Sequence, residues 1–238
     1  MTPFQAPRVE PATLPLVGGG VWTVRRLICI GRNYAAHAAE MGADVRSPPF
    51  HFLKHAHAVW PADASGEGVC PLPPKHDELH HEVELAIGLT QRAHMVSADV
   101  GWSCIGAAGV AIDLTRRDVQ RTAKASGRPW ASAKDFDAAA PFGWMQPLAD
   151  PHVLHAGAIA LQVNGAIRQE GDLSDMTWSA GELVAQLSML MTLHPGDVIL
   201  TGTPSGVAAL QDGDRVMATI AGLPELTFHM GSVRDGPM

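Results

Sequence analysis

Cysteine is scarce in this sequence, and the few cysteines are scattered. The 238 residues include 3 cysteines, Cys29, Cys70 and Cys104, and none belongs to a C-x-x-C pair. This usage argues against a disulfide framework and against a cysteine-based zinc site. Nowhere do about 18 apolar residues run together, and LPLVGGGVW near the N-terminus is too short and glycine-broken for a secretion signal. We therefore expect a cytoplasmic protein without a membrane partner.

Basic residues are also in the minority. The formal net charge is −7, and the two signs are interspersed, so there is no basic stripe to neutralise a phosphate backbone. Nucleic acid is therefore not an expected partner, and an anionic substrate would need local Arg, Lys or a metal cation. With 46% hydrophobic residues the chain can fold around its own core. We predict one globular domain over residues 26–238, preceded by a small segment rich in Pro and Gly over residues 1–25.

Short apolar runs bounded by Gly, Pro or Asp recur along the chain and are typical of strands. They occupy residues 27–31, 83–89, 107–112, 158–165, 197–202 and 215–222. Helical periodicity is clear over residues 34–42, after Asp113, and over residues 179–193, where Ser179 is a candidate N-cap. Strands outnumber helices and do not alternate strictly with them. The pattern therefore predicts a strand-rich α+β fold rather than a Rossmann or TIM architecture.

Two acidic residues interrupt the apolar run HHEVELAIGL. In a strand, residues two apart face the same side, so Glu82 and Glu84 are predicted to point together. Such a pair is costly unless it faces solvent on an edge strand or is neutralised by a cation. Asp113, which ends the apolar run AAGVAI, supplies a third carboxylate. Three oxygen ligands suit Mg²⁺ or Mn²⁺, while the adjacent His80 and His81 leave zinc as an alternative.

A second group of polar residues lies in GRNYAAHAAEMG. His37 and Glu40 are three apart, so they share one face of a short helix and can hydrogen-bond. A carboxylate that accepts one imidazole N–H leaves the other nitrogen to take a proton from water. The pair predicts a general-base dyad on a short lid helix, with an ordinary exposed helix pair as the alternative. Further on, TGTPSGV lacks the lysine of a phosphate loop but could offer backbone N–H groups to a carboxylate.

Seven segments together resemble the fumarylacetoacetate hydrolase family, in matching order from about residue 27 to 222. They are ICIGRNYAAHAAEMG, FLKHAHAV, HHEVELAIGL, GVAIDLTRRDVQ, GRPWASAKDFD, LQVNGAIRQEGDLSDMTW and HPGDVILTGTPSGV. The chain is most similar to the short acylpyruvate hydrolases of the family, and IDLTRRDVQ followed by GRPW resembles the bacterial fumarylpyruvate hydrolases. The resemblance implies a distorted mixed β-roll, a homodimer and a Mg²⁺ or Mn²⁺ site.

The resemblance also implies a role for nine residues. The metal ligands would be Glu82, Glu84 and Asp113, the catalytic residues His37, Glu40 and Lys134, and the substrate-binding residues Arg117, Gln120 and Thr203. Two positions depart from the family pattern: His55 stands where Pro usually follows the lysine of FLK, and Ala208 stands where Gly is frequent. Both positions neighbour the expected pocket, so the departures bear on which substrate is bound rather than on the reaction chemistry. His55 and His57 are at strand spacing, which we interpret as a polar strand face rather than a metal site.

The implied reaction is hydrolysis of a carbon–carbon bond in a 3-acylpyruvate, a small 2-oxo acid, with fumarylpyruvate giving fumarate and pyruvate. His37, oriented by Glu40, would deprotonate the attacking water, and Lys134 would stabilise the developing oxyanion. Three other hypotheses stay open at this point: decarboxylation of oxaloacetate, tautomerisation of a 2-oxo acid, and metal-dependent carboxylate binding without catalysis.

Overall fold

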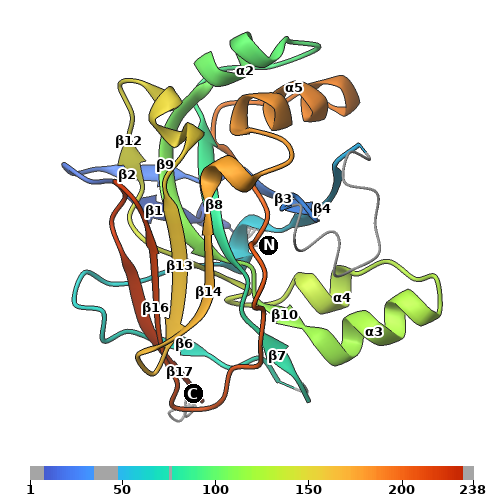
Figure 1. Ribbon diagram of the computed structural model, residues 1–238, viewed down its shortest axis with the longest axis vertical. Helices are drawn as coiled ribbons and strands as arrows, with labels where there is room; N and C mark the ends of the chain where they lie inside the picture. Colours follow the sequence, from blue (N-terminus) through green and yellow to red (C-terminus); the bar gives the residue numbers. More distant parts are fainter. Residues whose placement is uncertain (1–7, 35–47, 75–76, 233–238) are drawn as a thin grey trace, which may run out of the picture.

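The computed structural model describes residues 8–34, 48–74 and 77–232, and its main feature is a pair of packed β-sheets (Figure 1). The larger sheet has the order β4 (Phe50–Lys54), β3 (Arg26–Gly31), β15 (Asp197–Leu200), β8 (Val83–Leu89), β9 (Ile105–Ile112), β11 (Ala140–Phe142), β5 (Val59–Pro61), and β12 (Gln146–Pro147) also pairs with β9. The smaller sheet has the order β14 (Ala166–Asp172), β13 (Ala158–Val163), β16 (Arg215–Ile220), β17 (Leu226–Gly231), β6 (Val69–Pro71). The pairs β3–β15, β5–β11 and β6–β17 are parallel and the others antiparallel, so both sheets are mixed. The prediction of a strand-rich α+β fold is confirmed.

The main hydrophobic core lies between the two sheets. Leu85 and Ile87 of β8 are fully buried there, together with Leu161 of the smaller sheet. Because side chains alternate along a strand, Ala86 points to the opposite face of the larger sheet, where it joins a second core cluster with Leu14. This second cluster includes side chains from residues 8–25, and the predicted boundary after residue 25 stays a prediction.

In the described part of the chain, four short helices lie at the two ends of the sheets. α2 (Ala98–Ser103) and α5 (Ala180–Leu190) pack together at one end, and α3 (Arg117–Ala125) and α4 (Ala131–Lys134) lie towards the other (Figure 1). Ser179 is the N-cap of α5, as predicted, and its N–H donates to the Glu182 carboxylate at 2.8 Å. Among the described helices, none combines the length and the apolar character that crossing a lipid bilayer requires.

The remaining elements are small. They are the sheets β1 (Thr13–Pro15) with β2 (Val21–Thr23) and β7 (Leu79–His80) with β10 (Thr115–Arg116), and the 3-10 turns η1 (Ala56–Ala58), η2 (Pro151–His155) and η3 (Leu173–Asp175). Of the predicted lid helix over residues 34–42, residues 35–42 lie outside the described part of the chain. The interpretation of His55 and His57 as a polar strand face is wrong, because β4 ends at Lys54 and the chain then turns through η1.

Candidate active site

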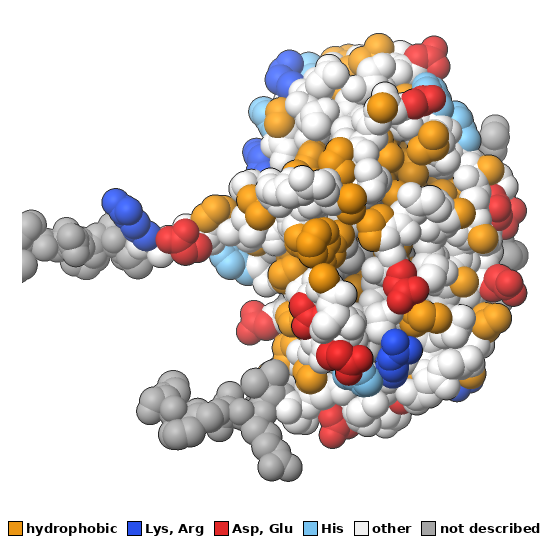
Figure 2. Space-filling view, turned by 90° about the vertical axis from the view of Figure 1, so that its left-hand side faces the viewer, with side chains coloured by type: hydrophobic (Ala, Val, Ile, Leu, Met, Phe, Trp, Pro, Cys, Tyr) orange, Lys and Arg blue, Asp and Glu red, His pale blue; other side chains and the backbone are white. Residues whose placement is uncertain are grey.

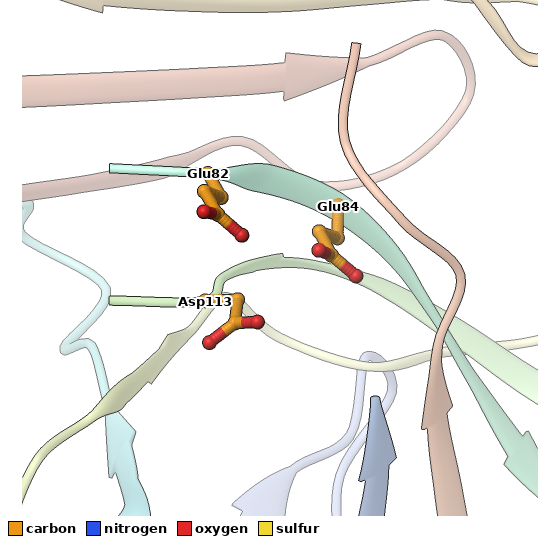
Figure 3. A group of neighbouring side chains, drawn as sticks. All are labelled: Glu82, Glu84 and Asp113. Atoms are coloured by element: carbon orange, nitrogen blue, oxygen red, sulfur yellow. The ribbon is translucent and has the colours of Figure 1, made fainter. Parts of the chain in front are cut away.

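Three acidic side chains converge where β8 begins and β9 ends (Figure 3). Glu82 directly precedes β8, Glu84 is its second residue, and Asp113 directly follows β9. The two strands are antiparallel with Val83 opposite Ile112, so the start of one adjoins the end of the other. One carboxylate oxygen from each acid lies within 4.8 Å of the other two. The exposed fractions are only 7% for Glu82 and 1% for Glu84 and Asp113, which rules out the alternative of a solvent-facing pair.

Two buried lysines and an arginine neutralise part of this negative charge. Lys134 Nζ lies 2.8 Å from Glu82 Oε2 and 2.7 Å from Asp113 Oδ2. Lys54 Nζ lies 2.8 Å from Asp113 Oδ1, and the Arg117 guanidinium contacts the other oxygen of Glu82. Burial alone would raise the pKa of Glu82, but Lys134 and Arg117 outweigh it and lower this pKa to about 2. Glu82 is therefore ionised at neutral pH.

Glu84 is compensated less well than Glu82. Its Oε2 accepts a hydrogen bond from the Gly202 N–H at 2.7 Å, and among the described residues no lysine or arginine forms an ion pair with it. Burial, together with the charges of Asp113 and Glu82, raises the pKa of Glu84 well above its ordinary value. A divalent cation between the three carboxylates would offset both the burial and the repulsion. The buried, all-oxygen donor set therefore fits Mg²⁺ or Mn²⁺.

Gly202 is needed for this geometry. Its φ is +99°, and a Cβ at this position would lie 2.8 Å from Asn33 Cβ. Glycine therefore lets the backbone turn so that its N–H reaches Glu84. Thr201 and Gly202 leave the sheet after β15 ends at Leu200, so this strand is shorter than the predicted 197–202. The segment TGTPSGV thus offers an N–H to a carboxylate of the protein itself.

Lys134 is a charged group rather than a base. Burial acts to lower its pKa, but the charges of Asp113 and Glu82 outweigh burial and raise this pKa above its usual range. The Lys134 ammonium is therefore protonated and can donate hydrogen bonds to an anionic ligand. Lys134 donates to both Glu82 and Asp113, and the Glu84 carboxylate lies close to these two acids. The ammonium is therefore part of the acidic cluster.

Lys54 is a site residue that the sequence analysis missed. It is 1% exposed, and besides its contact with Asp113 it donates to the carbonyl oxygens of Leu114 at 3.1 Å and Ala139 at 2.8 Å. The only sign in the sequence is a lysine at the end of the run FHFLK, a pattern equally typical of an exposed strand end. Its buried partners lie far along the chain and could not be identified locally.

A cavity opens above the carboxylates, and one face of α3 forms part of its wall. Arg117, Gln120 and Lys124 are three and four apart and so lie on the same side of the helix, with Arg117 Nη1 donating to Gln120 Oε1 at 2.6 Å. The full lining is Ile30, Gly31, Arg32, Phe50, Phe52, Glu82, Glu84, Arg117, Gln120, Lys124, Trp130, Lys134 and Thr203. Six of the nine predicted site residues are in this lining, and Asp113 contacts one of them, Lys134. His37 and Glu40 lie outside the described residues.

A buried hydrogen-bond network fixes Thr203. Gln169 Nε2 donates to Thr203 Oγ1 at 2.7 Å and to the Pro204 carbonyl at 2.9 Å. Gln169 Oε1 accepts the Val83 N–H at 3.1 Å and lies 2.8 Å from His81 Nδ1. The Val83 N–H and the Pro204 carbonyl set the orientation of the amide, so His81 carries its proton on Nδ1. Because Thr203 Oγ1 accepts from Gln169, its own hydrogen is left to donate to another group. Gln169 was missed by the sequence analysis.

The histidines beside the triad make their contacts elsewhere. His80 Nε2 lies 2.6 Å from Glu78 Oε1, and its Nδ1 accepts from Arg117 Nε at 3.3 Å. In the described part of the chain, the three carboxylates form the one group of His, Cys, Asp or Glu side chains close enough to hold a metal. The geometry thus favours an oxygen-only site over zinc bound through His80 or His81.

The two departures from the family pattern lie outside the cavity lining. The His55 ring contacts Asp135, and the Ala208 carbonyl accepts the His81 N–H at 3.1 Å. Neither residue lines the cavity. They therefore do not alter the described pocket wall directly.

Several known proteins are similar to this chain over most of its length. A crystal structure of fumarylpyruvate hydrolase from Pseudomonas aeruginosa in complex with Mn²⁺ and pyruvate is 38% identical with a TM-score of 0.92, over 98% of this chain and 100% of that chain. Oxaloacetate tautomerase FAHD1, mitochondrial, from Arabidopsis thaliana is 41% identical over 208 residues, which is 86% of this chain and 90% of the relative. The protein of the same name from Homo sapiens is 39% identical over 210 residues, or 87% and 91%. The family model "Fumarylacetoacetate (FAA) hydrolase C-terminal" matches residues 26–230, and the chain belongs to this family of enzymes.

Proposed function

We propose that this protein is a metal-dependent hydrolase that cleaves a carbon–carbon bond in a 3-acylpyruvate, with fumarylpyruvate giving fumarate and pyruvate. The observation that carries the proposal is the buried oxygen triad beside the protonated Lys134. The chain is similar over nearly its whole length to a fumarylpyruvate hydrolase in complex with Mn²⁺ and pyruvate, which supports the same chemistry. Such a site suits a substrate that carries a carboxylate next to a 2-oxo group.

Glu82, Glu84 and Asp113 would hold the Mg²⁺ or Mn²⁺. When bound, the ion supplies Lewis-acid stabilisation of the enolate charge that develops on the pyruvate part. Lys134 would donate to the oxygen that becomes negative when water adds to the distal carbonyl, and its raised pKa keeps it available as a donor. Arg117, Gln120 and Thr203 would bind the substrate from the cavity wall.

His37 and Glu40 would supply the proton transfers. In the proposed reaction His37 takes a proton from water, while Glu40 orients the imidazole and stabilises its protonated form. The water oxygen bonds to the distal carbonyl carbon, the adjacent carbon–carbon bond breaks, and the electron pair leaves on the pyruvate enolate. The enolate carbon then takes up a proton. These two roles follow from the family resemblance of YAAHAAEMG.

A second candidate function is tautomerisation or decarboxylation of oxaloacetate. Tautomerisation is favoured by the relatives from Arabidopsis thaliana and Homo sapiens, which are 41% and 39% identical and carry the name oxaloacetate tautomerase. The same triad and Lys134 could recognise the carboxylate and 2-oxo group of oxaloacetate. Neither of these reactions needs an attacking water, so the general-base dyad would not act on water.

Turnover measurements distinguish the two candidates. Purified protein with Mg²⁺ or Mn²⁺ is assayed with fumarylpyruvate, acetylpyruvate and oxaloacetate, and the products are identified. We expect the largest kcat/KM for fumarylpyruvate, with equal amounts of fumarate and pyruvate formed. A larger kcat/KM for oxaloacetate, without hydrolysis of the acylpyruvates, would replace the proposal with the second candidate. Metal binding without turnover of any 2-oxo acid would favour carboxylate binding without catalysis.

We further propose that the protein is a cytoplasmic homodimer. Figure 2 shows hydrophobic side chains gathered in the middle of the face that lies at the left in Figure 1. On that side β2 exposes Val21 by 61%. A soluble monomer rarely exposes a large contiguous apolar patch, so a second copy of the chain is the proposed cover. Light scattering on the eluting protein should give twice the mass of one chain, and a monomer mass would contradict this proposal.

A further inference from the structure

The mouth of the cavity carries two cations to which the proposed reaction assigns no role. Arg32 and Lys124 line the cavity together with Glu82 and Glu84, two of the three proposed metal ligands, and both cations are exposed to solvent. Among the described residues, no carboxylate forms an ion pair with either of them, whereas Arg117 and Lys134 both contact Glu82. Arg32 and Lys124 are therefore available to a ligand.

Three aromatic rings connect these cations with the buried end of the cavity. Lys134 Nζ lies 5.0 Å from the centre of the Phe52 ring. The Phe52 and Trp130 rings are 6.2 Å apart, and Trp130 meets Phe50 edge to face at 5.4 Å. We call Phe50, Phe52 and Trp130 the aromatic wall. It begins beside the proposed catalytic lysine and continues to Phe50, which is 36% exposed.

Each outer cation lies against the outer part of the aromatic wall. Lys124 Nζ is 4.9 Å from the Trp130 ring, and Arg32 Cζ is 5.6 Å from the Phe50 ring. These contacts hold both cations at the cavity mouth. The cavity therefore has a buried ammonium at its inner end, an aromatic wall along its length and two exposed cations at its outer end.

The backbone holds Phe50 and Arg32 in these positions. Gly31 is paired with Phe50 across β3 and β4, and a Cβ on Gly31 would lie 2.0 Å from Phe50 Cζ, so glycine lets the ring close over the strand. Arg32 has a φ of 62°, which is a strained conformation for a residue other than glycine. The side chain of the next residue, Asn33, makes two hydrogen bonds with the Trp178 backbone. Asn33 Nδ2 donates to the Trp178 carbonyl at 2.9 Å, and Asn33 Oδ1 accepts from the Trp178 N–H at 2.8 Å. The backbone position of Arg32 is thus fixed by its neighbours.

Lys124 lies near other cationic side chains that disfavour its charge. Burial lowers the pKa of Lys124, and the nearby charges of Arg117 and Arg32 act in the same direction. A bound anion would reduce this repulsion, and it would be drawn to the same place by both cations. The mouth of the cavity therefore favours a ligand whose outer end is negative.

We propose that Arg32 and Lys124 form an outer anion subsite that binds the far carboxylate of a dicarboxylic acylpyruvate, whose flat unsaturated chain lies along the aromatic wall. The subsite rests on the proposed function, because that function places the inner end of the substrate beside Lys134. Arg and Lys recognise a carboxylate through charge-assisted hydrogen bonds, and flat unsaturated carbons pack well on aromatic faces. The enzyme would therefore prefer an acyl group that ends in a carboxylate over one that ends in a methyl group.

The first test compares two substrates that differ at the outer end. Arg32→Gln and Lys124→Gln should each raise KM for fumarylpyruvate about 10-fold, while kcat/KM for acetylpyruvate changes by less than about twofold. The matched control is Arg121→Gln on the same helix, where an exposed arginine pairs with Glu78 at 2.7 Å outside the cavity. This control should behave as the parent on both substrates. Equal losses on both substrates, or no loss on either, would overturn the subsite.

The second test does not depend on turnover. Calorimetry of the Mn²⁺-loaded protein compares 2-oxopimelate, which has the chain length of fumarylpyruvate, with 2-oxoheptanoate, which carries a methyl group in place of the far carboxylate. The parent should bind 2-oxopimelate at least about 10-fold more tightly, and the Arg32→Gln/Lys124→Gln double variant should lose this preference while its affinity for 2-oxoheptanoate is kept. Equal affinities in the parent would overturn the subsite even if fumarylpyruvate is hydrolysed. A preference that depends on both residues would support the subsite even if hydrolysis is absent and the proposed function fails.

Discussion

Lys54 and Asp113 form an ion pair in the interior, with Nζ 2.8 Å from Oδ1 and each residue 1% exposed. The same ammonium donates to the carbonyl oxygens of Leu114 and Ala139, so it joins β4 to the segments that follow β9 and precede β11. Removing one partner of a buried pair leaves the other charge without compensation, which costs far more than the pair contributes as a whole. Lys54 is thus a structural support for a proposed metal ligand.

Lys54→Met should therefore lower the free energy of unfolding by about 3–5 kcal/mol, because Asp113 loses one of its two lysine partners and three buried carbonyl oxygens lose their donor. Urea denaturation of metal-free protein measures the change. The matched control is Lys124→Met, which removes an exposed lysine and should cost less than about 1 kcal/mol. A loss below about 1 kcal/mol for Lys54→Met would show that the contact with Asp113 is not structurally important.

Gln169 is predicted to act through Thr203. Gln169→Leu removes the donor that fixes Thr203 Oγ1, so kcat/KM should fall about 10–100-fold, the effect of losing one or two buried hydrogen bonds. Thr203→Val should cause a loss of similar size. If Gln169 acts by orienting Thr203, the double variant should lose little more than the worse single variant. If the losses of the two single variants multiply in the double variant, Gln169 does not act through Thr203.

Local patterns were sufficient for the triad but not for its supports. The alternation of side chains along a strand depends only on the local backbone, so the convergence of Glu82 and Glu84 could be predicted from two-residue spacing. Asp113 was identified by its place at the end of an apolar run. Lys54, by contrast, contacts a carbonyl 85 residues away, and Gln169 bonds to a backbone N–H 86 residues away. Such contacts depend on which strands pair, and no local pattern specifies that.

The same limit applies to the fold. Strands such as residues 83–89 were predicted from their apolar runs and bounding residues, because these signals are local. In the larger sheet β15 lies between β3 and β8, although it is far from both along the chain. No local sequence pattern predicts this strand order. The β-roll was therefore predicted only through the family resemblance. His55 and His57 were misassigned because a strand pattern does not show where the next turn begins.

Glu84 gives a direct test of the metal site. EDTA should abolish activity and Mg²⁺ or Mn²⁺ should restore it, because three carboxylates form a hard-oxygen site. Glu84→Gln should weaken Mn²⁺ affinity by at least about 100-fold in calorimetry, since a charged ligand is lost. The metal-free variant should remain folded, because the amide oxygen can still accept the Gly202 N–H while the repulsion with Glu82 and Asp113 is relieved. Unchanged Mn²⁺ affinity would remove Glu84 from the set of ligands.

Metal affinity should also depend on pH through Glu84. Its raised pKa means that in metal-free protein the carboxyl group holds its proton to a higher pH than an ordinary glutamate. The metal must displace this proton, so affinity should fall as pH is lowered, by up to about 10-fold per pH unit for one proton. Calorimetry in buffers of different ionisation enthalpy counts the protons released on Mn²⁺ binding. Proton release by the parent equal to that of Glu84→Gln would contradict the assignment.

His37 separates hydrolysis from decarboxylation. If His37 activates water, His37→Ala should lower acylpyruvate hydrolysis about 10²–10⁴-fold, which is the usual contribution of a positioned general base. Decarboxylation of oxaloacetate should lose less, because no water attacks in that reaction. Glu40→Gln should cause a smaller loss of hydrolysis, since the imidazole remains but loses the carboxylate that orients it and stabilises its protonated form. Both reactions are to be measured on both variants under the same metal concentration. If hydrolysis survives His37→Ala within a few-fold, the dyad is structural, and a reaction on oxaloacetate becomes the better account of the site.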